Sequence, residues 1–234
     1  MSDYRIIEVK QSVFADNNAD AARLRDELKS EGTFLINLMS SPGAGKTTTL
    51  KRTIGMFDKS VKIGVMEADI DGEVDAEAIE NAGARAIQIH TGGMCHLDAD
   101  MTRQGIREFG TQDLDLVILE NVGNLVCPAE FDTGAMRNVM ILSVPEGDDK
   151  PLKYPLMFRN CQLVLINKCD VLSAFEDFDC EKVTERIHFR NPGCKVIFIS
   201  AKTGEGFDEW INTLKEWITD FKAGKMEPPV HYDN

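Results

Sequence analysis

Short apolar runs alternate with segments of helical periodicity along most of this chain. The apolar runs predict buried strands at residues 33–39, 61–67, 85–90, 114–120, 138–144, 161–167 and 195–199. Apolar positions three to four residues apart predict helices at residues 19–31, 46–56, 75–81, 98–109, 177–190 and 206–222. This alternation predicts a three-layer α/β fold, with a mostly parallel sheet covered by helices on both faces. In such folds the functional sites lie at the carboxyl ends of the strands.

The length of the chain, 234 residues, is enough for one large α/β domain with a full core. We expect Asn17 and Asn18 to cap the first helix. The predicted domain covers residues 17–224, between an N-terminal extension at residues 1–16 and a C-terminal tail at residues 225–234. Both ends are expected to be loosely held.

A phosphate-binding loop follows the first apolar run. The segment Ser40-Ser41-Pro42-Gly43-Ala44-Gly45-Lys46-Thr47-Thr48 lies between a predicted strand and a predicted helix, which is the order that a P-loop requires. Gly43 and Gly45 allow successive backbone N–H groups to point at phosphate oxygens. Lys46 can reach the β- and γ-phosphates, and the Thr47 hydroxyl can bind Mg²⁺. The segment therefore predicts a nucleotide site, to which the start of the helix adds its positive dipole end.

A second motif predicts which nucleotide binds. Asn167-Lys168-Cys169-Asp170 ends a predicted strand about 120 residues after the P-loop, and Ser200-Ala201-Lys202 follows the next predicted strand. The Asp170 carboxylate can accept hydrogen bonds from the ring N–H and the exocyclic amine of guanine, a pattern that adenine lacks. Lys168 can lie along the base, Asn167 can tie this loop to the P-loop, and the Ser200 segment can close over the base. Together the motifs predict GTP binding.

Composition narrows the possible partners and the compartment. The formal net charge of −13 argues against a nucleic-acid or anionic-membrane surface. No apolar run approaches the ~18 residues of a membrane span, and the first residues lack the apolar segment of a signal peptide. The six cysteines are too sparse for a disulfide scaffold. We expect a cytoplasmic protein that binds neither nucleic acid nor membranes.

Three soft metal ligands follow two of the predicted strands. Cys95 and His96 come after the strand at 85–90, and Cys127 comes after the strand at 114–120. Because both loops leave a parallel sheet at the same edge, the three side chains could converge on Zn²⁺, Ni²⁺ or Cu(I). A fourth position would stay open for a metal in transit or for a ligand from a second subunit. The chain has no Cys-x-x-Cys motif, and free cysteine is often a small buried residue, so a structural role stays open.

Carboxylates near the P-loop are candidates for phosphate chemistry. Glu120 ends the strand at 114–120, and Gly123 follows at a spacing that suits a γ-phosphate sensor. Asp75 opens the next predicted helix after Glu67 and Asp69, so an acid there could order water or complete a Mg²⁺ shell. No glutamine is placed to orient the attacking water, and we expect slow hydrolysis by the protein alone.

These motifs together resemble the HypB family, the nickel-incorporation GTPases of [NiFe]-hydrogenase maturation. The resemblance covers roughly residues 17–222. Beside the P-loop and the guanine loop, it is carried by Glu67-Ala68-Asp69, Asp75-Ala76, Gly92-Gly93-Met94-Cys95-His96-Leu97 and Glu120-Asn121-Val122-Gly123-Asn124-Leu125-Val126-Cys127-Pro128. Many GTPases share the nucleotide motifs, so the Cys-His pair and the Glu-Asn-Val-Gly segment narrow the match.

The resemblance implies a GTPase fold of the signal-recognition-particle/MinD class that forms a homodimer when GTP binds. It implies Lys46, Asp75 and Glu120 as catalytic residues, and Thr47, Asp75 and Glu120 around Mg²⁺. It also implies that Cys95, His96 and Cys127 bind Ni²⁺ or Zn²⁺ near the dimer interface.

The function that the resemblance implies is GTP-dependent nickel delivery. Its expected ligands are GTP and GDP, and its expected partners are a nickel-carrying accessory protein and the hydrogenase large-subunit precursor. Bacterial relatives often add a Cys-rich nickel motif or a His-rich tract near the N-terminus. This chain has no cysteine before Cys95 and only four histidines, so the expected metal site is the Cys95, His96 and Cys127 set alone.

Two other functions fit the same motifs. One is an accessory GTPase for another metalloenzyme such as urease. The other is a GTP-dependent regulatory switch in which Cys95, His96 and Cys127 are structural. A small-molecule kinase is opposed by the guanine loop and by the lack of a separate acceptor-binding lid.

Overall fold

The computed structural model describes residues 3–68, 79–91 and 93–233. Within these ranges seven strands form one sheet in the order β3-β2-β4-β1-β5-β6-β7, and each neighbouring pair is parallel. The sheet confirms the predicted α/β architecture. The strands are β1 (Phe34–Ser40), β2 (Ile63–Glu67), β3 (Arg85–Gln88), β4 (Leu116–Glu120), β5 (Arg137–Ser143), β6 (Leu163–Asn167) and β7 (Lys195–Phe198).

The central strand β1 carries the P-loop at its carboxyl end. It pairs with β4 on one side and β5 on the other, so that Leu38 lies opposite both Glu120 and Val139. All seven of its residues are buried, because helices cover both faces of the sheet. This double burial explains why the strand appears in the sequence as a continuous apolar run rather than as an alternating one.

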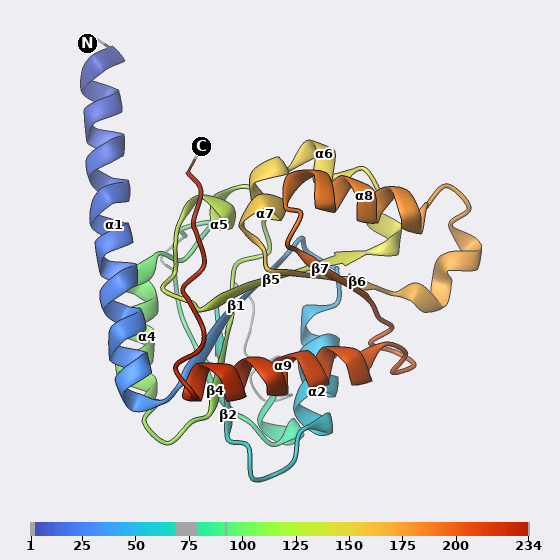
Figure 1. The fold of residues 1–234 in the computed structure, drawn as a ribbon, viewed down its shortest axis with the longest axis horizontal. Coiled ribbons are helices and arrows are strands. Elements are labelled where there is room, and N and C mark those ends of the chain that lie inside the picture. The colour runs from blue at the N-terminus through green and yellow to red at the C-terminus, as the bar shows by residue number, and fades with distance from the viewer. Residues whose placement is uncertain (1–2, 69–78, 92, 234) are drawn as a thin grey trace.

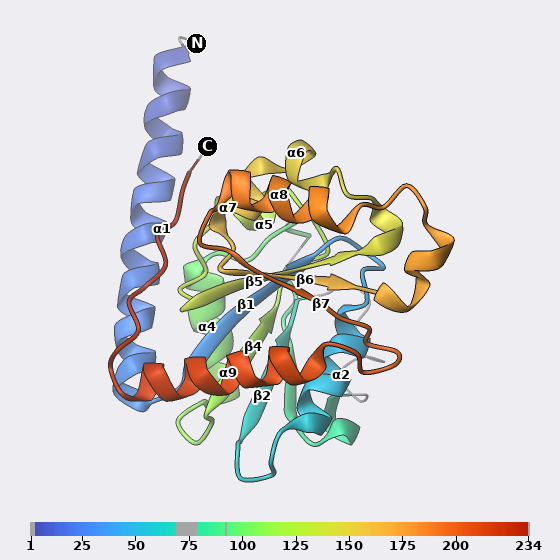
Figure 2. The same ribbon diagram turned by 45° about the vertical axis from the view of Figure 1, so that its right-hand side comes forward.

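Helices form a layer on each face of the sheet (Figures 1 and 2). On one face α2 (Lys46–Met56) and α9 (Phe207–Lys222) bury their apolar sides against the strands. The opposite face is covered by α1 (Asp3–Glu31), α4 (Ala99–Phe109), α5 (Cys127–Glu130), α7 (Pro155–Asn160) and α8 (Cys180–Arg190). Short connectors are η1 (Val144–Glu146), α6 (Lys150–Lys153) and η2 (Cys169–Ala174). The apolar side of α9 therefore packs on the sheet, as its spacing predicts.

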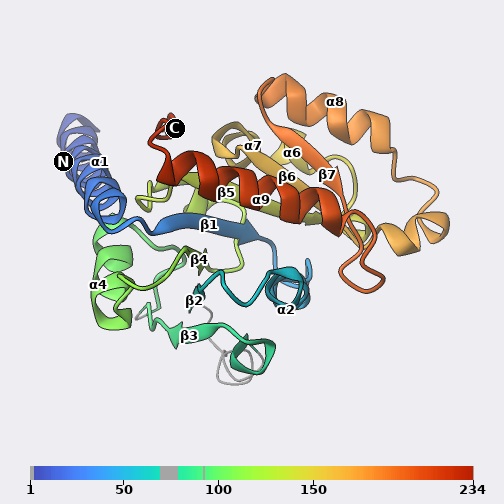
Figure 3. The same cartoon turned by 60° about the horizontal axis from the view of Figure 1, so that its bottom comes forward.

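The N-terminal helix differs from the sequence prediction. A single helix runs from Asp3 to Glu31, so the prediction that Asn17 and Asn18 cap a helix starting at residue 19 is wrong. Asn17 lies inside α1, where its Nδ2 donates to the carbonyl of Asp132 and its Oδ1 accepts from the amide of Ala99. The Asn17 carboxamide therefore bonds to residues distant in the sequence, rather than to amides at the start of a helix as the sequence pattern predicts. The start of α1 extends beyond the rest of the domain (Figure 1), and its second half lies beside α4 (Figure 3).

The C-terminal segment also differs from its prediction. The side chain of Met226 is buried, and the carbonyl of Glu227 accepts a hydrogen bond from Arg137. Tyr232 exchanges two backbone hydrogen bonds with the Asn160 carboxamide, of 2.9 and 3.0 Å. Residues 225–233 are therefore held against the domain rather than loosely attached.

Two further predictions concern the ends of helices and the membrane. The predicted helix at 75–81 lies mostly outside the described residues, and residues 79–82 are helical. The helix predicted from 177 begins at Cys180, because the Asp179 carboxylate caps it by accepting from the amides of Glu181 and Lys182. No helix in the described part of the chain combines the length and the apolar character needed to cross a bilayer.

The contact between α9 and α2 gives a test of the fold. Trp210 donates from Nε1 to the Thr53 hydroxyl at 3.0 Å, and both side chains are buried. We expect Trp210→Phe to lower the free energy of unfolding by about 1–3 kcal/mol, because Thr53 loses its partner and a small void remains. Combining it with Thr53→Val in a urea-unfolding double-mutant cycle should show a coupling of about 0.5–1.5 kcal/mol. Strictly additive losses would contradict the bond.

Candidate nucleotide site and thiol pair

At Gly45, directly before α2, the P-loop backbone has a conformation that only glycine adopts without strain. Gly45 has φ of 98°, and a Cβ atom built there would lie 2.6 Å from Nδ2 of Asn167. A side chain would therefore strain the backbone and push the guanine loop away. The next residue, Lys46, begins α2, so the helix starts directly at the end of the loop, where its unpaired N–H groups favour an anion.

Asn167 connects the three nucleotide loops. Its Nδ2 donates to the carbonyl of Ala44 in the P-loop at 2.9 Å, and its Oδ1 accepts from the amide of Ala201 at 3.0 Å. The predicted tie between the guanine loop and the P-loop is thus present. Lys168 adds a second tie, because its Nζ donates to the carbonyl of Gly43 at 2.7 Å. Lys168 also adopts a left-handed backbone with φ of 65°, which turns the chain sharply after β6.

Asp170, the carboxylate predicted to bind guanine, is oriented by its neighbours. The Ser200 hydroxyl donates to Asp170 Oδ1 at 2.7 Å and itself accepts from the amide of Thr203. Arg52 on α2 donates to the carbonyls of Ala201 and Lys202 at 2.7 and 2.9 Å. The Ser200–Lys202 loop is therefore fixed from two sides beside Asp170. Arg52 has no signal in the sequence, because its partners lie about 150 residues away.

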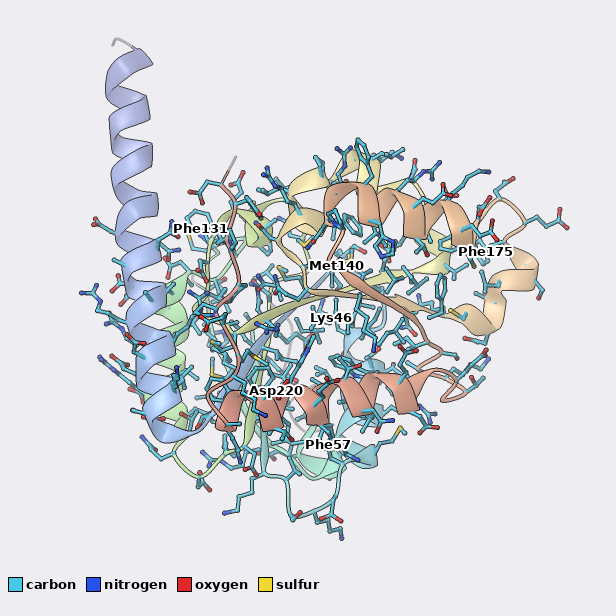
Figure 4. All side chains as sticks on the ribbon, viewed as in Figure 1. Lys46, Phe57, Phe131, Met140, Phe175 and Asp220 are labelled. Atoms are coloured by element: carbon cyan, nitrogen blue, oxygen red, sulfur yellow. The ribbon has the colours of Figure 1, made fainter. Side chains whose placement is uncertain are left out.

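Carboxylates and a lysine meet at the phosphate end of the site. Lys46 Nζ lies 3.8 Å from Glu120 Oε1, and both side chains are buried. Glu67, at the end of β2, lies opposite Glu120 in the strand register and is also buried. A Cβ atom at Gly123 would lie 3.4 Å from Lys46 Nζ, so the segment after β4 contacts the P-loop lysine. Lys46 lies near the centre of the molecule in Figure 4.

The remaining predicted residues lie at the rim of this site or outside the described part. Thr47 is half-buried and Thr48 is exposed at the start of α2. Asp75 lies outside the described residues, so its position relative to the phosphates stays a prediction. The sequence analysis missed Glu146, whose carboxylate accepts from Ser143 and from the P-loop residue Ser41. Its signal was available, because Ser143-Val-Pro-Glu146 has the spacing of a capping box.

A chain of buried amides crosses the sheet from the end of β4 through β1 to β5. Asn121, directly after β4, donates to Asn37 on β1, and Asn37 donates to Asn138 on β5, both at 3.1 Å. Asn138 in turn donates to the carbonyl of Asn160. The Asn160 Nδ2 also donates to the carbonyl of Ala129 in α5. These bonds connect the segment that contacts Lys46 with the helix that begins at Cys127.

The structure brings the two predicted thiols together. Cys95 is exposed in the loop after β3, and Cys127 is half-buried at the start of α5. A side-chain hydrogen bond with Cys95 raises the pKa of the Cys127 thiol, and burial raises it further. Their closeness follows from the parallel sheet, which sends the loops after β3 and β4 to the same edge.

His96 lies beside the thiols with its ring packed flat on another ring. Its Nδ1 is 3.9 Å from Cys95 Sγ. The imidazole stacks on Phe131 with 3.9 Å between ring centroids and 5° between planes. Burial lowers the pKa of His96, against the opposing charges of Asp98 and Glu130. Within residues 3–68, 79–91 and 93–233 no three His, Cys, Asp or Glu side chains are arranged to hold a metal ion, so the predicted three-ligand set is not preformed in one copy.

The other thiols are consistent with packing. Burial raises the pKa of Cys169, in the guanine loop, to about 12 and that of Cys194 to about 12. Cys161 is fully buried, which places its pKa well above the usual range. Such thiols stay protonated and unreactive at neutral pH.

Comparison with known proteins identifies the family. Residues 34–198 match the model of the CobW/HypB/UreG nucleotide-binding domain. The hydrogenase maturation factor HypB of Azotobacter chroococcum is 43% identical over 230 residues, which cover 98% of this chain and 74% of that protein. The chain belongs to the HypB family. Like the other members of this P-loop GTPase family, it hydrolyses GTP.

Solved structures agree with this assignment. The crystal structure of HypB from Helicobacter pylori in complex with nickel has a TM-score of 0.81 and 36% identity. The match covers 91% of this chain and 98% of that chain. The cell division protein FtsY of Thermotoga maritima has a TM-score of 0.54 at 16% identity, over 83% of this chain and 69% of that one. That likeness shows a common fold alone, and the expected GTPase fold is confirmed.

The guanine loop gives the second test. Asp170→Asn should lower GTP affinity at least about 100-fold, because two charge-assisted hydrogen bonds of roughly 1.5–3 kcal/mol each are weakened. The same change should improve binding of xanthosine triphosphate, whose extra carbonyl needs a donor at this position. Calorimetry with each nucleotide measures this change in specificity. Asp177→Asn, which alters an exposed carboxylate nearby, is the control. Unchanged GTP affinity in Asp170→Asn would contradict the assigned base contact.

Proposed function

We propose that this protein is a GTP-driven metallochaperone that delivers nickel during maturation of [NiFe]-hydrogenase. Its relatives are named hydrogenase maturation factors, and one of them was solved in complex with nickel. The observation that carries the proposal is the course of residues 120–127. This segment contacts the P-loop lysine at Gly123 and reaches the Cys127 thiol four residues later.

The phosphates and the thiols are coupled through this segment in our proposal. A γ-phosphate would attract Lys46, whose Nζ lies 3.8 Å from Glu120 Oε1. A Cβ atom at Gly123 would lie 3.4 Å from Lys46 Nζ, so in this proposal a shift of Lys46 toward the phosphate moves the backbone at Gly123. Between Gly123 and α5 the Asn124 carboxamide accepts from the amide of Val126 at 2.8 Å. This bond stiffens the short connection, so movement at Gly123 is passed to Cys127 rather than absorbed.

Mg²⁺ belongs at the phosphate end of the site. The Thr47 hydroxyl and the Glu120 carboxylate are the oxygen ligands that this hard cation prefers, and the buried Glu67 beside Glu120 adds negative charge. Asp75 is proposed as a further oxygen donor. When bound, the cation would supply positive charge that offsets the negative charge developing on the phosphates during hydrolysis. Lys46 stabilises the negative charge of the leaving phosphate. Gly123 is the proposed γ-phosphate sensor.

The transported metal is held by thiols at the surface in this proposal. Cys95 and Cys127 supply soft ligands for Ni²⁺ or Zn²⁺, and His96 lies next to Cys95. Two exposed apolar side chains flank the thiols, with Met94 47% and Val126 49% accessible. Such a surface suits a second copy of the chain. We propose that the GTP-bound homodimer completes the metal site with ligands from both copies.

Delivery requires partners and a reducing compartment. A nickel-carrying accessory protein is the proposed donor, and the hydrogenase large-subunit precursor is the proposed acceptor. We place the exchange in the cytoplasm, because thiols that hand over a metal must stay reduced.

Hydrolysis by the isolated protein is expected to be slow. Neither the P-loop nor the segment at residues 121–127 contains a glutamine that could orient the attacking water, and we expect a single-turnover rate well below the ~1 s⁻¹ of assisted GTPases. Lys46→Ala should abolish turnover by removing charge stabilisation, whereas Lys51→Ala, at an exposed lysine on the same helix, should not. A rate at or above ~1 s⁻¹ without a partner would show that another group positions the water.

Metal binding and nucleotide state are expected to depend on each other. Ni²⁺ affinity should differ about 5- to 150-fold between the GDP complex and the complex with a non-hydrolysable GTP analogue. By thermodynamic linkage, Ni²⁺ must change the relative affinity for the two nucleotides by the same factor. Cys95→Ala should remove metal binding and keep GTP binding, while Cys180→Ala serves as the control at a remote half-buried thiol. Equal metal affinities in both states, at fixed pH and protein concentration, would instead favour a regulatory switch with structural thiols.

A further inference from the structure

One side chain of α1 contacts both segments that carry the thiols. Asn17 Nδ2 donates to the carbonyl of Asp132, and Asn17 Oδ1 accepts from the amide of Ala99, each at 2.9 Å. Ala99 is the first residue of α4, four residues after Cys95. Asp132 lies two residues after α5, the helix that begins at Cys127. The Asn17 carboxamide therefore bridges the Cys95 segment and the Cys127 segment.

A second contact joins the same two segments from the other side. Phe131, next to Asp132, stacks on His96, next to Cys95. Figure 4 shows Phe131 on the side of the molecule where α1 lies. The stacked rings resist separation of the two segments, but stacking does not prevent the rings from sliding past each other. The two hydrogen bonds of Asn17 are directional and oppose this sliding.

The position of Asn17 is itself fixed by the rest of α1. Arg25, two turns further along, donates to the carbonyl of Ala135 and forms a buried ion pair with Asp132. Leu24 packs so closely on Gly134 that a Cβ atom there would lie 2.8 Å from it. These contacts prevent α1 from sliding along the loop after α5. Asn17 consequently acts as a fixed point rather than a mobile side chain.

Loss of the Asn17 carboxamide would affect two buried groups. Asn17 is only 8% exposed, so water has little access to its two partners. The Ala99 amide is one of the first-turn N–H groups that a helix leaves unpaired, and the Asp132 carbonyl would lose the bond from Asn17. Each segment would then relax toward new partners independently, and the spacing of the thiols would no longer be defined.

We propose that Asn17 is a positioning residue for the thiol pair, and that it sets the separation of Cys95 and Cys127 through the backbone of both segments. This proposal rests on the proposed function, because it concerns the metal that the two thiols hold. Hydrogen-bonded groups outside the ligand set typically change metal affinity 10- to 100-fold when removed. Asn17 differs from Arg25 in that its side chain bonds to both thiol segments rather than to one.

The test compares two variants with a matched control. Asn17→Leu keeps the bulk of the side chain and removes both bonds, and Asn17→Ser removes both with less apolar surface if the first variant fails to fold. Thr33→Val is the control, because Thr33 is fully buried and its hydroxyl donates to the carbonyl of Thr111 at the opposite end of β1. It loses a buried hydrogen bond far from the thiols.

Three readouts separate positioning from general destabilisation. The first is Ni²⁺ affinity of the full chain, with the thiolate-to-nickel charge-transfer band as the signature of thiol ligation. The second is the metal-free yield of a Cys95–Cys127 bridge formed by a short bifunctional thiol reagent and located by peptide mass spectrometry. The third is GTP affinity, which reports that the nucleotide site is folded.

We expect both Asn17 variants to bind Ni²⁺ about 10- to 100-fold more weakly, with a weaker charge-transfer band, a lower bridging yield and unchanged GTP affinity. Thr33→Val should match the unmodified protein in all three readouts. Asn17 variants that match the unmodified protein in affinity and bridging, or a control that loses as much as they do, would overturn the proposal. If the unmodified protein bridges its thiols but binds no Ni²⁺, the proposed function fails, and the bridging yield alone decides the role of Asn17.

Discussion

All the strands of the described sheet run in one direction, and this constraint gathers the chemistry of the protein at one edge. The P-loop follows β1, the thiol segments follow β3 and β4, and the guanine loop follows β6. The parallel register therefore brings the candidate nucleotide loops and the two thiols to the same edge, although they lie far apart in the sequence.

The buried amides show what this arrangement requires of the core. Asn37 and Asn138 lie in otherwise apolar strands, where an unpaired carboxamide would cost several kcal/mol. Each is bonded to the next, and the chain continues from Asn121 at the strand end to Asn160 at the end of α7. These polar groups are therefore tolerated in the core because each has a hydrogen-bond partner. That set links the residue after β4 to the middle of β1 and to the start of β5.

Local motifs account for the parts of the structure that could be predicted from the sequence. The P-loop and the guanine loop depend on backbone shapes and short spacings, and the tie of Asn167 to Ala44 was predictable from them. The approach of Cys95 to Cys127 followed from sheet topology. The predicted helix cap at Asn17 was wrong because the hydrogen-bond partners of its side chain lie 82 and 115 residues away. A local sequence pattern contains information only about residues nearby in the chain. The orientation of His96 depends on its packing against Phe131, which no spacing in the sequence describes.

The order of the strands also has a consequence for synthesis. The central strand ends at Ser40, but its two neighbours are completed only at Glu120 and Ser143. At the usual 5–20 residues per second, this fully buried strand waits about 5 to 20 seconds for both partners after it is made. The base contacts come later still, with Asp170 and Ser200. A growing chain therefore exposes its future core before it can bind the nucleotide, and GTP can stabilise the fold only after the segment with Asp170 and Ser200 has been made.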